Sequence, residues 1–393
     1  MQIQLEKTLD VEIVERELAQ LWTESARDPN ADTEAAVLRA RVANLLVFIS
    51  LETALDHVHR MLRELTAIHP SRVLLMLGAR EAVDQDIEMF VESICQRDKR
   101  GAIRLSCEEI TLKATGKFVA ELPSASLPLL VPDLATFLWW QDALSVSNKV
   151  LNTLLRATDR LIIDSVDFAD PVSELVEMNH LYAENEFDHV GISDVNWARL
   201  TFWRGLLADY YDVPAYQPLL ERIDQVRIDY LGPELAPDTL APQVLLIAGW
   251  LASRLEWKLS EKQQVDENDQ TTSFSFNSKD GRAIKLELKR VERGEHKPGR
   301  LVKVELRAGG DETGESSVPP ASFVVSRSED NLHLVTEAKL GPTSHRGRVL
   351  PVRNRSTAQL LSREMEILCN DQIYQEAVAV AAKMIARSSS PSG

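Results

Sequence analysis

The sequence predicts an α/β protein: an N-terminal α/β domain with a mainly parallel sheet plus a hairpin, followed by an α+β domain with an antiparallel hairpin or sheet. Residues 134–140 and 161–163 are short apolar runs on either side of a segment with helical spacing, which is typical of a strand, a helix and a strand in a parallel sheet. Residues 283–291 and 301–308 instead alternate apolar and charged side chains, as strands with one dry face do. The length of 393 residues exceeds one ordinary core of about 150 residues.

The sequence of the N-terminal half predicts the following helices and strands, in chain order. An apolar stripe at helical spacing predicts a first helix that ends before Asp28 and Pro29. Uncharged apolar runs predict buried strands at 45–49 and 73–77, with a helix over 55–68 between them. This half therefore alternates strands and helices, as a parallel sheet requires.

The pattern changes at Asp170 and Pro171, so we place the domain boundary there, which gives domains 1–168 and 169–393. The second domain is expected to be mostly helical as far as Tyr211. Beyond that point the sequence predicts an antiparallel hairpin formed by the two alternating segments and a polar loop over 260–272. Further strands are expected at 226–230, 323–326 and 333–336, and helices at 244–257, 357–370 and 374–386.

The chain is acidic, with 60 Asp and Glu against 44 Lys and Arg and a net charge of −16. Such a charge repels nucleic acid and anionic lipid, so we expect neither nucleic acid nor a membrane as a partner and favour a protein. No apolar run approaches the roughly 18 residues of a membrane span, and the first residues lack the pattern of an export signal. Three cysteines agree with a reducing cytoplasm.

Motifs for nucleotides and for activated nucleophiles are absent from the sequence. No GxGxxG, GxxxxGK[ST] or GxSxG occurs, so no cofactor is expected. Two acidic clusters leave alternatives open. Glu177, His180 and Glu184 share a helical face, either as metal ligands or as a solvated surface. Asp164 and its acidic neighbours surround a strand end, either as acid/base groups or as helix caps.

Two pairs of large side chains mark strand ends in the first domain. Trp139 and Trp140 point to opposite faces of their strand, so either both belong to the core or one lines an interface. Arg72 and Arg160 flank other strand ends and either bind an anion or form structural ion pairs. All four are candidates for an interaction surface.

Basic residues gather in two stretches of the second domain. Residues 282–307 hold more Lys and Arg than Glu, and residues 339–363 hold no acidic residue at all. In an acidic chain, these stretches either attract an acidic partner or phosphate, or neutralise acidic helices of the same protein. The candidate residues are Lys285, Lys289, Lys303, Arg346 and Arg348.

Four stretches of the middle of the chain resemble one protein family. LPLLVPDLATFLWW at 127–140, followed by DRLIIDS at 159–165, is similar to the OpcA family of glucose-6-phosphate dehydrogenase assembly proteins. HPSRVL at 69–74 and APQVLLIAGWLASRLEW at 241–257 resemble the same family.

The resemblance implies a cytoplasmic, non-catalytic assembly factor and allosteric activator of glucose-6-phosphate dehydrogenase, the entry enzyme of the oxidative pentose phosphate pathway. That dehydrogenase is then the expected partner. Two alternatives stay open. One is a phosphosugar-acting enzyme with the Asp164 region as its acid/base group. The other is a structural scaffold without regulatory effect.

The spacing of residues 87–95 fits a helix or a strand, and the resemblance favours a strand that pairs with 103–114 as a hairpin. With the turn near Lys99, Cys95 would face about residue 103, and Cys107 would lie about four residues further along, roughly 13 Å away. This exceeds the limit of about 7 Å between the α-carbons of a disulfide. We therefore expect no disulfide between these cysteines and no thiol switch.

Overall fold

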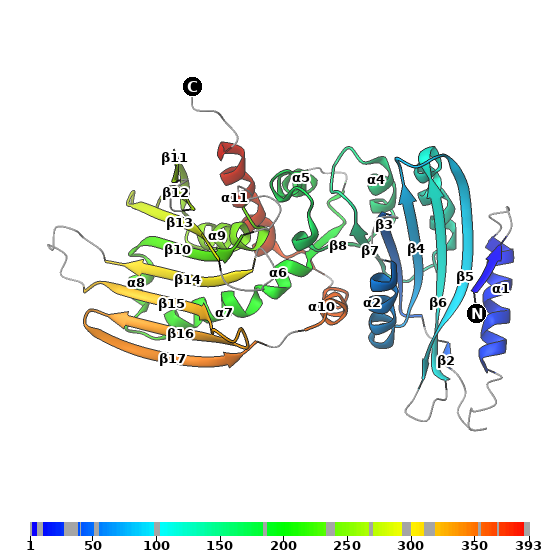
Figure 1. Cartoon of the computed structure of the whole chain (residues 1–393), viewed down its shortest axis with the longest axis horizontal. Helices are drawn as coiled ribbons and strands as arrows, with labels where there is room; N and C mark the ends of the chain where they lie inside the picture. Colours follow the sequence, from blue (N-terminus) through cyan, green and yellow to red (C-terminus); the bar gives the residue numbers. More distant parts are fainter. Residues whose placement is uncertain are drawn as a thin grey trace. The chain divides into compact units, whose positions relative to one another are not determined.

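The protein forms two compact units that are each built from several stretches of the chain (Figure 1). The computed structural model describes residues 2–5, 11–26, 38–39, 41–50, 55–97, 103–183, 187–232, 240–266, 270–292, 300–309, 319–352, 355–367 and 369–388. The first unit comprises Met1–Asp164, Glu184–Val195 and Arg355–Asn370, and the second comprises Ser165–Ala183, Asn196–Asn354 and Asp371–Gly393. Relative to the expected boundary after Phe168, the first unit thus also takes in two later segments.

In the described part of the chain, the first unit contains a nine-stranded, mainly parallel sheet. Six strands run parallel in the order β6-β4-β3-β7-β8-β9, while β5 is antiparallel to β6 and β1 is antiparallel to β5. The strands are β1 (Gln2–Leu5), β2 (Leu38–Arg39), β3 (Ala43–Ser50), β4 (Ser71–Ala79), β5 (Gln85–Arg97), β6 (Ile103–Thr115), β7 (Thr136–Gln141), β8 (Arg160–Ile163) and β9 (Gly191–Asp194).

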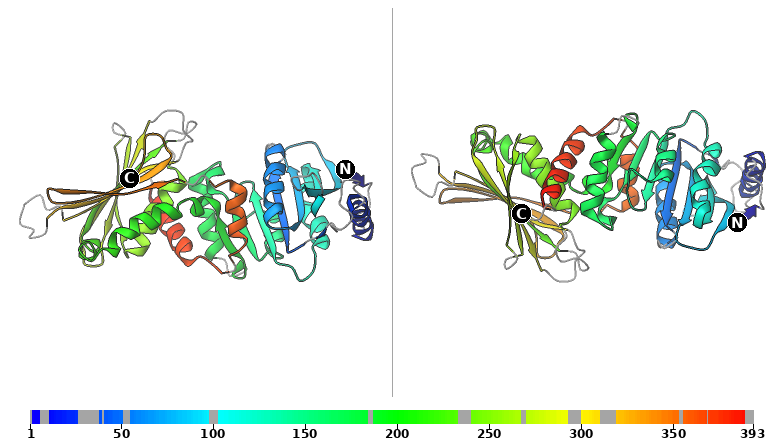
Figure 2. Two further views of the ribbon diagram at one scale, coloured as in Figure 1. Left: turned by 90° about the horizontal axis from the view of Figure 1, so that it is seen from below. Right: turned by 90° about the horizontal axis from the view of Figure 1, so that it is seen from above.

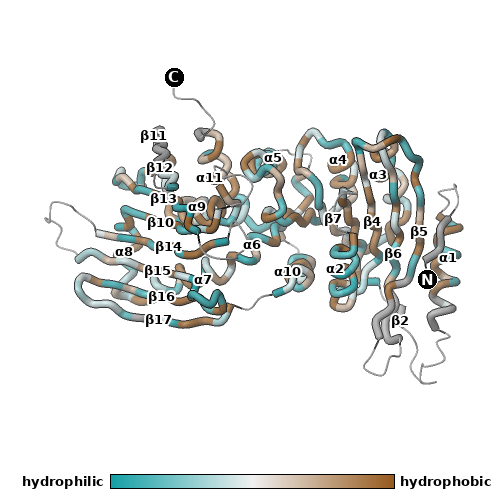
Figure 3. The backbone as a smooth tube through the Cα atoms, viewed as in Figure 1, coloured by the Kyte–Doolittle hydropathy of each residue, from teal (hydrophilic) through white to brown (hydrophobic). Residues whose placement is uncertain are grey.

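The central strands of this sheet are buried along nearly their whole length and mainly hydrophobic in their middle (Figure 3), because both of their faces are covered. Helix α2 turns a buried stripe that includes Leu62 and Leu65 toward the sheet. Asn148 caps α4 by accepting hydrogen bonds from the amides of Val150 and Leu151. The α/β prediction for this half is confirmed. Its helices are α1 (Val11–Ala26), α2 (Leu55–Ile68), α3 (Leu122–Ser126), α4 (Lys149–Leu155) and α10 (Thr357–Glu364).

The hairpin of β5 and β6 exists, but its register differs from the expected one. Cys95 faces Ser106, and Cys107 faces Ile94. Cys107 is thus one residue, not four, from the position opposite Cys95, and the distance argument against a disulfide is wrong. The side chain of Cys107 is fully buried, and its Sγ lies 3.8 Å from the carbonyl oxygen of Thr66.

Strand β6 places two neighbouring glutamates on opposite faces of the sheet. Glu108 pairs with arginines, as described below. Glu109 is 2% exposed, accepts a hydrogen bond of 3.3 Å from Thr111 and lies 3.4 Å from Nε2 of His59. Burial and the charge of Glu92 on β5 raise the pKa of Glu109 to about 7, against weaker opposing effects of Thr111 and a nearby arginine.

In the described residues, the second unit contains an eight-stranded, mostly antiparallel sheet in the order β11-β12-β13-β10-β14-β15-β16-β17. Strand β10 lies between β13 and β14, parallel to β13 and antiparallel to β14. Residues 283–291 and 301–308 are β13 and β14. Because β10 lies between them, the prediction that they pair as a hairpin is wrong. The strands are β10 (Ile223–Leu231), β11 (Lys258–Asp266), β12 (Thr271–Asn277), β13 (Ala283–Val291), β14 (Leu301–Ala308), β15 (Ala321–Arg327), β16 (His333–Leu340) and β17 (Thr343–Pro351).

The helices packed against this sheet lie on one of its faces (Figures 1 and 2). The other face carries mainly the polar positions of the alternating strands, and no described helix covers it. The prediction of one dry and one wet face is confirmed for β13 by the burial of alternate residues. In β14 the alternation is interrupted because Glu305 is buried as well. The helices are α5 (Pro171–Ala183), α6 (Val195–Arg199, at the boundary of the units), α7 (Thr201–Asp209), α8 (Gln217–Leu220), α9 (Pro242–Arg254) and α11 (Gln372–Ser388).

Six strands were not expected, and four of them lie at sheet edges. β1, β9, β11 and β17 end their sheets, β2 pairs with β6, and β12 pairs β11 with β13. β11 occupies part of the expected loop 260–272, and β9 occupies part of a stretch expected to be helical. Edge strands carry polar and charged residues, which protect them from pairing with other chains, so they lack the apolar pattern of central strands.

Gly249 lets α9 and α11 approach each other closely, because a Cβ at this position would overlap the backbone carbonyl of Ala377. We expect Gly249→Ala to lower the free energy of unfolding by about 2 kcal/mol, despite its gain in helix propensity. The matched control is Gly205→Ala in α7, where nothing lies within 4 Å of the added Cβ; it should stabilise by about 0.5–1 kcal/mol. Urea unfolding of both variants checks this, and a change of the same sign in both would contradict it.

Candidate interaction surface

The tandem tryptophans of β7 belong to the core. Trp139 is 0% exposed and Trp140 is 2% exposed. Trp140 stacks on Phe48 of β3, with ring centroids 4.5 Å apart, and its indole N–H donates to the carbonyl of Ala143. Their candidacy for an interaction surface is therefore wrong, because central strands of this sheet are covered on both faces.

Arg72 is also buried, at 1% exposure, and its partners are all within the first unit. Its Nε donates to Glu108 at 2.8 Å, and its Nη1 donates to Glu15 at 2.5 Å and to the carbonyl of Leu129 at 2.9 Å. Burial alone would lower the pKa of Arg72, but the bonds to Glu15 and Glu108 outweigh it and raise the pKa. Arg41 binds the other oxygen of Glu108. The alternative of structural ion pairs is thus confirmed for Arg72.

Arg160, at 2% exposure, is likewise structural. Its guanidinium donates to Oγ of Ser193 at 2.9 Å and to the carbonyl of Cys369 at 2.7 Å. The guanidinium of Arg160 packs over Gly191: a Cβ added to Gly191 would lie 2.8 Å from Cζ of Arg160. Neither Arg72 nor Arg160 is available to a partner.

The basic candidates lie instead on the helix-free face of the second sheet. We call nine residues on β13, β10 and β14 the charged face. Strand register sets them side by side in three rows of three. The rows are Lys285-Gln225-Arg307, Glu287-Arg227-Glu305 and Lys289-Asp229-Lys303.

The charged face neutralises most of its own charge. Lys285 lies 2.6 Å from Glu287, Arg227 lies 2.8 Å from Asp229, and Glu305 is bound by its two flanking cations. Burial would raise the pKa of Glu305, but hydrogen bonds from Arg307 and Lys303 outweigh it and lower the pKa to about 2. With five cations and three anions, the face is only slightly basic, so the expected strong basic patch is not there.

Beyond β14 the same face of the sheet becomes partly apolar. Register places Val324 of β15 opposite Glu305, and Val335 of β16 opposite Val349 of β17. Val349 is 62% exposed. A small group of valines thus lies beside the charged face, on the side of the sheet that no described helix covers.

The two remaining candidates both belong to β17. Arg348 belongs to the helix side of β17, where its Nη1 lies 2.8 Å from Asp209 of α7. Arg346 belongs to β17 and faces Glu337 in the strand register, but its side chain lies outside the described part of the structure.

The acidic clusters considered for chemistry are dispersed. Glu177, which is half-buried, lies 3.9 Å from the exposed His180, and Glu184 lies outside the described residues. Asp159 accepts a hydrogen bond of 2.7 Å from the amide of Thr136. Within the described ranges, no three His, Cys, Asp or Glu side chains gather as metal ligands. In the same residues, no helix has both the length and the apolar character of a membrane span.

Sequence reasoning missed the centre of the charged face. Arg227 and Asp229 lie on β10, which was expected as an isolated strand. The signal was present, since Gln225, Arg227 and Asp229 recur with a period of two. Which strands this polar row would join depends on long-range pairing, which periodicity does not encode.

Comparisons with known proteins agree on one family. Residues 62–180 match the family model described as the glucose-6-phosphate dehydrogenase subunit N-terminal domain, and residues 190–378 match the corresponding C-terminal domain. The chain is 31% identical over 230 residues to the putative OxPP cycle protein OpcA of Nostoc punctiforme, covering 58% of this chain and 47% of that one. It is 29% identical to the OpcA protein of Synechococcus elongatus, covering 80% and 67%. The chain therefore spans about half to two thirds of these relatives.

Solved structures resemble the chain only distantly. The 3-ketoreductase KijD10 of Actinomadura kijaniata, in its open conformation, gives a TM-score of 0.48 at 11% identity, covering 88% of this chain and 96% of that chain. Levoglucosan dehydrogenase with NADH gives a TM-score of 0.47 at 11% identity, covering 89% and 97%. Values this low say nothing about chemistry in this chain.

Proposed function

Because this chain belongs to the OpcA family of glucose-6-phosphate dehydrogenase assembly proteins, we propose that it is a non-catalytic assembly factor and allosteric activator of that dehydrogenase. The observation that carries the proposal is the match of both subunit domains, which together run from residue 62 to residue 378. Since the dehydrogenase is a metabolic enzyme, we place the complex in the cytoplasm.

We propose the charged face and the neighbouring valines as the docking surface. Val324, Val335 and Val349 would supply the apolar centre of an interface, and the ion-paired side chains beside them its polar rim. The ion pairs hold the charged side chains in place before binding, so less side-chain entropy is lost on association. Charges in such a rim set orientation and association rate more than affinity.

Activation requires that the chain bind the active conformation of the dehydrogenase more tightly than the inactive one. Equal affinity for both conformations would shift nothing, however tight the binding. A preference of about 1.4 to 3 kcal/mol would raise the ratio of active to inactive enzyme about tenfold to more than a hundredfold.

Co-purification of this chain with the dehydrogenase of the same organism, followed by titration to determine a Kd, tests the partnership. We expect a saturable complex. The absence of any complex at micromolar concentrations would contradict the assignment, and binding without a change in dehydrogenase kinetics would indicate a scaffold. Turnover of a phosphosugar by this chain alone would indicate an enzyme.

Charge reversal on β13 tests the docking surface. The double variant Lys285→Glu and Lys289→Glu should slow association with the dehydrogenase about tenfold at low salt and flatten its salt dependence, because it makes the charged face acidic. The control Lys117→Glu and Lys149→Glu changes the net charge equally but lies in the first unit. Stopped-flow or surface-binding kinetics measure both, and equal on-rates for the two variants would place the interface elsewhere.

A further inference from the structure

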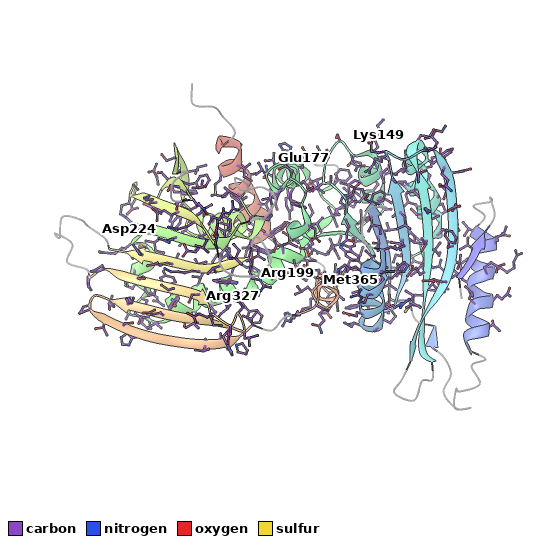
Figure 4. The ribbon with its side chains drawn as sticks, in the orientation of Figure 1. Lys149, Glu177, Arg199, Asp224, Arg327 and Met365 are labelled. Atoms are coloured by element: carbon purple, nitrogen blue, oxygen red, sulfur yellow. The ribbon has the colours of Figure 1, made fainter. Side chains whose placement is uncertain are left out.

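One end of the second sheet collects arginines that strand direction brings together. β13, β10 and β15 are parallel to one another and end there, while β14 begins there. Arg300 immediately precedes β14, and its carbonyl accepts a hydrogen bond of 3.0 Å from the amide of Leu231. Arg327 ends β15, and its Nε donates to the carbonyl of Leu301 at 3.3 Å. Figure 4 labels Arg327 at this end of the sheet.

Arg327 is held in an unusual environment for a guanidinium. Its Nη1 is buried and has no hydrogen-bond partner among the described residues. No carboxylate of the described residues forms an ion pair with Arg327. Its Cζ lies 5.9 Å from the ring centroid of the buried Trp203 of α7. Burial, and then the charge of Arg300, lower the pKa of Arg327 to about 10. Two cations thus lie near each other in a chain of net charge −16.

Arg72 shows how carboxylates neutralise a buried arginine in this protein. Two carboxylates and a carbonyl bind Arg72, whereas Arg327 has one carbonyl and a distant aromatic ring. A buried donor without a partner costs free energy, and in native proteins such groups generally bind water or an ion.

We propose that Arg327 and Arg300 form a binding site for a phosphate group, either inorganic phosphate or the phosphate of a small monoester. Arginine donates in a planar fork that matches phosphate oxygens, and two arginines match the two charges of the dianion better than the single charge of a carboxylate. The bond from Nε to Leu301 fixes the orientation of the Arg327 fork and leaves Nη1 to donate. The site does not depend on the dehydrogenase, so it can be tested on this chain alone.

The test is calorimetric titration of the isolated full chain with inorganic phosphate at pH 8 and constant ionic strength, with chloride as the comparison. We expect saturable binding of one phosphate per chain. Arg327→Gln should weaken it at least about tenfold, which corresponds to about 1.4 kcal/mol. Arg327→Lys should weaken it less, because it keeps the charge but loses the fork. The control Arg348→Gln, on the same sheet but paired with Asp209, should bind as the parent does.

Two results would overturn the proposal. One is the absence of saturable binding by the parent chain, which would mean that Arg327 is balanced by another group of the protein. The other is undiminished binding by Arg327→Gln, which would place the phosphate elsewhere. If that variant fails to fold, Arg300→Gln provides the same comparison, and a phosphate-dependent rise in Tm of the parent that Arg300→Gln retains would overturn the proposal too.

Discussion

Replacing Arg72 by methionine should lower the free energy of unfolding of the first unit by about 3 to 5 kcal/mol, as breaking a buried ion pair does. Methionine fills part of the space but takes one cation from Glu108, whose side chain is 7% exposed and also pairs with Arg41. Glu15 and the carbonyl of Leu129 also lose their donor. The measurement is urea unfolding, in which the loss should appear in the transition of the first unit, since a chain with two compact units need not unfold in one step.

A matched control is Arg348→Met, because Arg348 and Asp209 form an exposed pair, at 69% and 45% side-chain exposure. Exposed pairs contribute about 0 to 1 kcal/mol. The double variant Arg72→Met with Glu108→Gln should recover part of the loss, because it also removes the buried charge that has lost a cation. An Arg72→Met loss no larger than that of the control would contradict the description of this cluster.

Glu109→Gln should stabilise the protein at pH 8 by about 3 kcal/mol and leave it nearly unchanged at pH 4.5. The pKa of Glu109 is raised from 4.5 to about 7 in the folded protein, so between these values the folded state binds more protons than the unfolded state. Stability contributed by this group therefore falls as pH rises through that window, and it stays low above pH 7. Glutamine carries no charge to bury and removes the effect.

The measurement is the free energy of unfolding of parent and variant from pH 4.5 to pH 8. In the difference between the two, the contributions of the other titrating groups cancel. Glu88→Gln on β5 is a control, because the side chain of Glu88 is 32% exposed and paired with Lys113. A difference that does not grow with pH would show that Glu109 titrates normally.

Glu108 and Glu109 show why part of this structure follows from sequence and part does not. Alternation along β6 places the two carboxylates on opposite faces, and any strand assignment predicts that much. Their opposite environments depend on which elements cover each face: Arg72 and Glu15 belong to the network of Glu108, and His59 of α2 lies next to Glu109. Such neighbours come from long-range packing, which local patterns do not encode.

The same distinction between local pattern and long-range packing explains which features of the candidate interaction surface were predicted correctly. Apolar runs correctly predicted the central strands of the first sheet, because strands buried on both faces need continuous hydrophobicity. Alternation correctly predicted the wet and dry faces of β13. It did not indicate that β10 separates β13 from β14, nor that β10 adds Arg227 and Asp229, whose opposite charges cancel. On the flanking strands, Glu287 and Glu305 pair with Lys285, Lys303 and Arg307. Local charge counts therefore predicted a basic patch where the fold has a nearly neutral one.

The measurement that tests the central claim most directly is the initial rate of the same organism's glucose-6-phosphate dehydrogenase over a range of glucose 6-phosphate concentrations, with and without saturating amounts of this chain. The chain alone, in the same assay, serves as the blank. We expect a lower apparent KM for glucose 6-phosphate when the chain is present and no turnover in the blank. Unchanged kcat and KM at a saturating concentration of the chain would contradict its role as an activator.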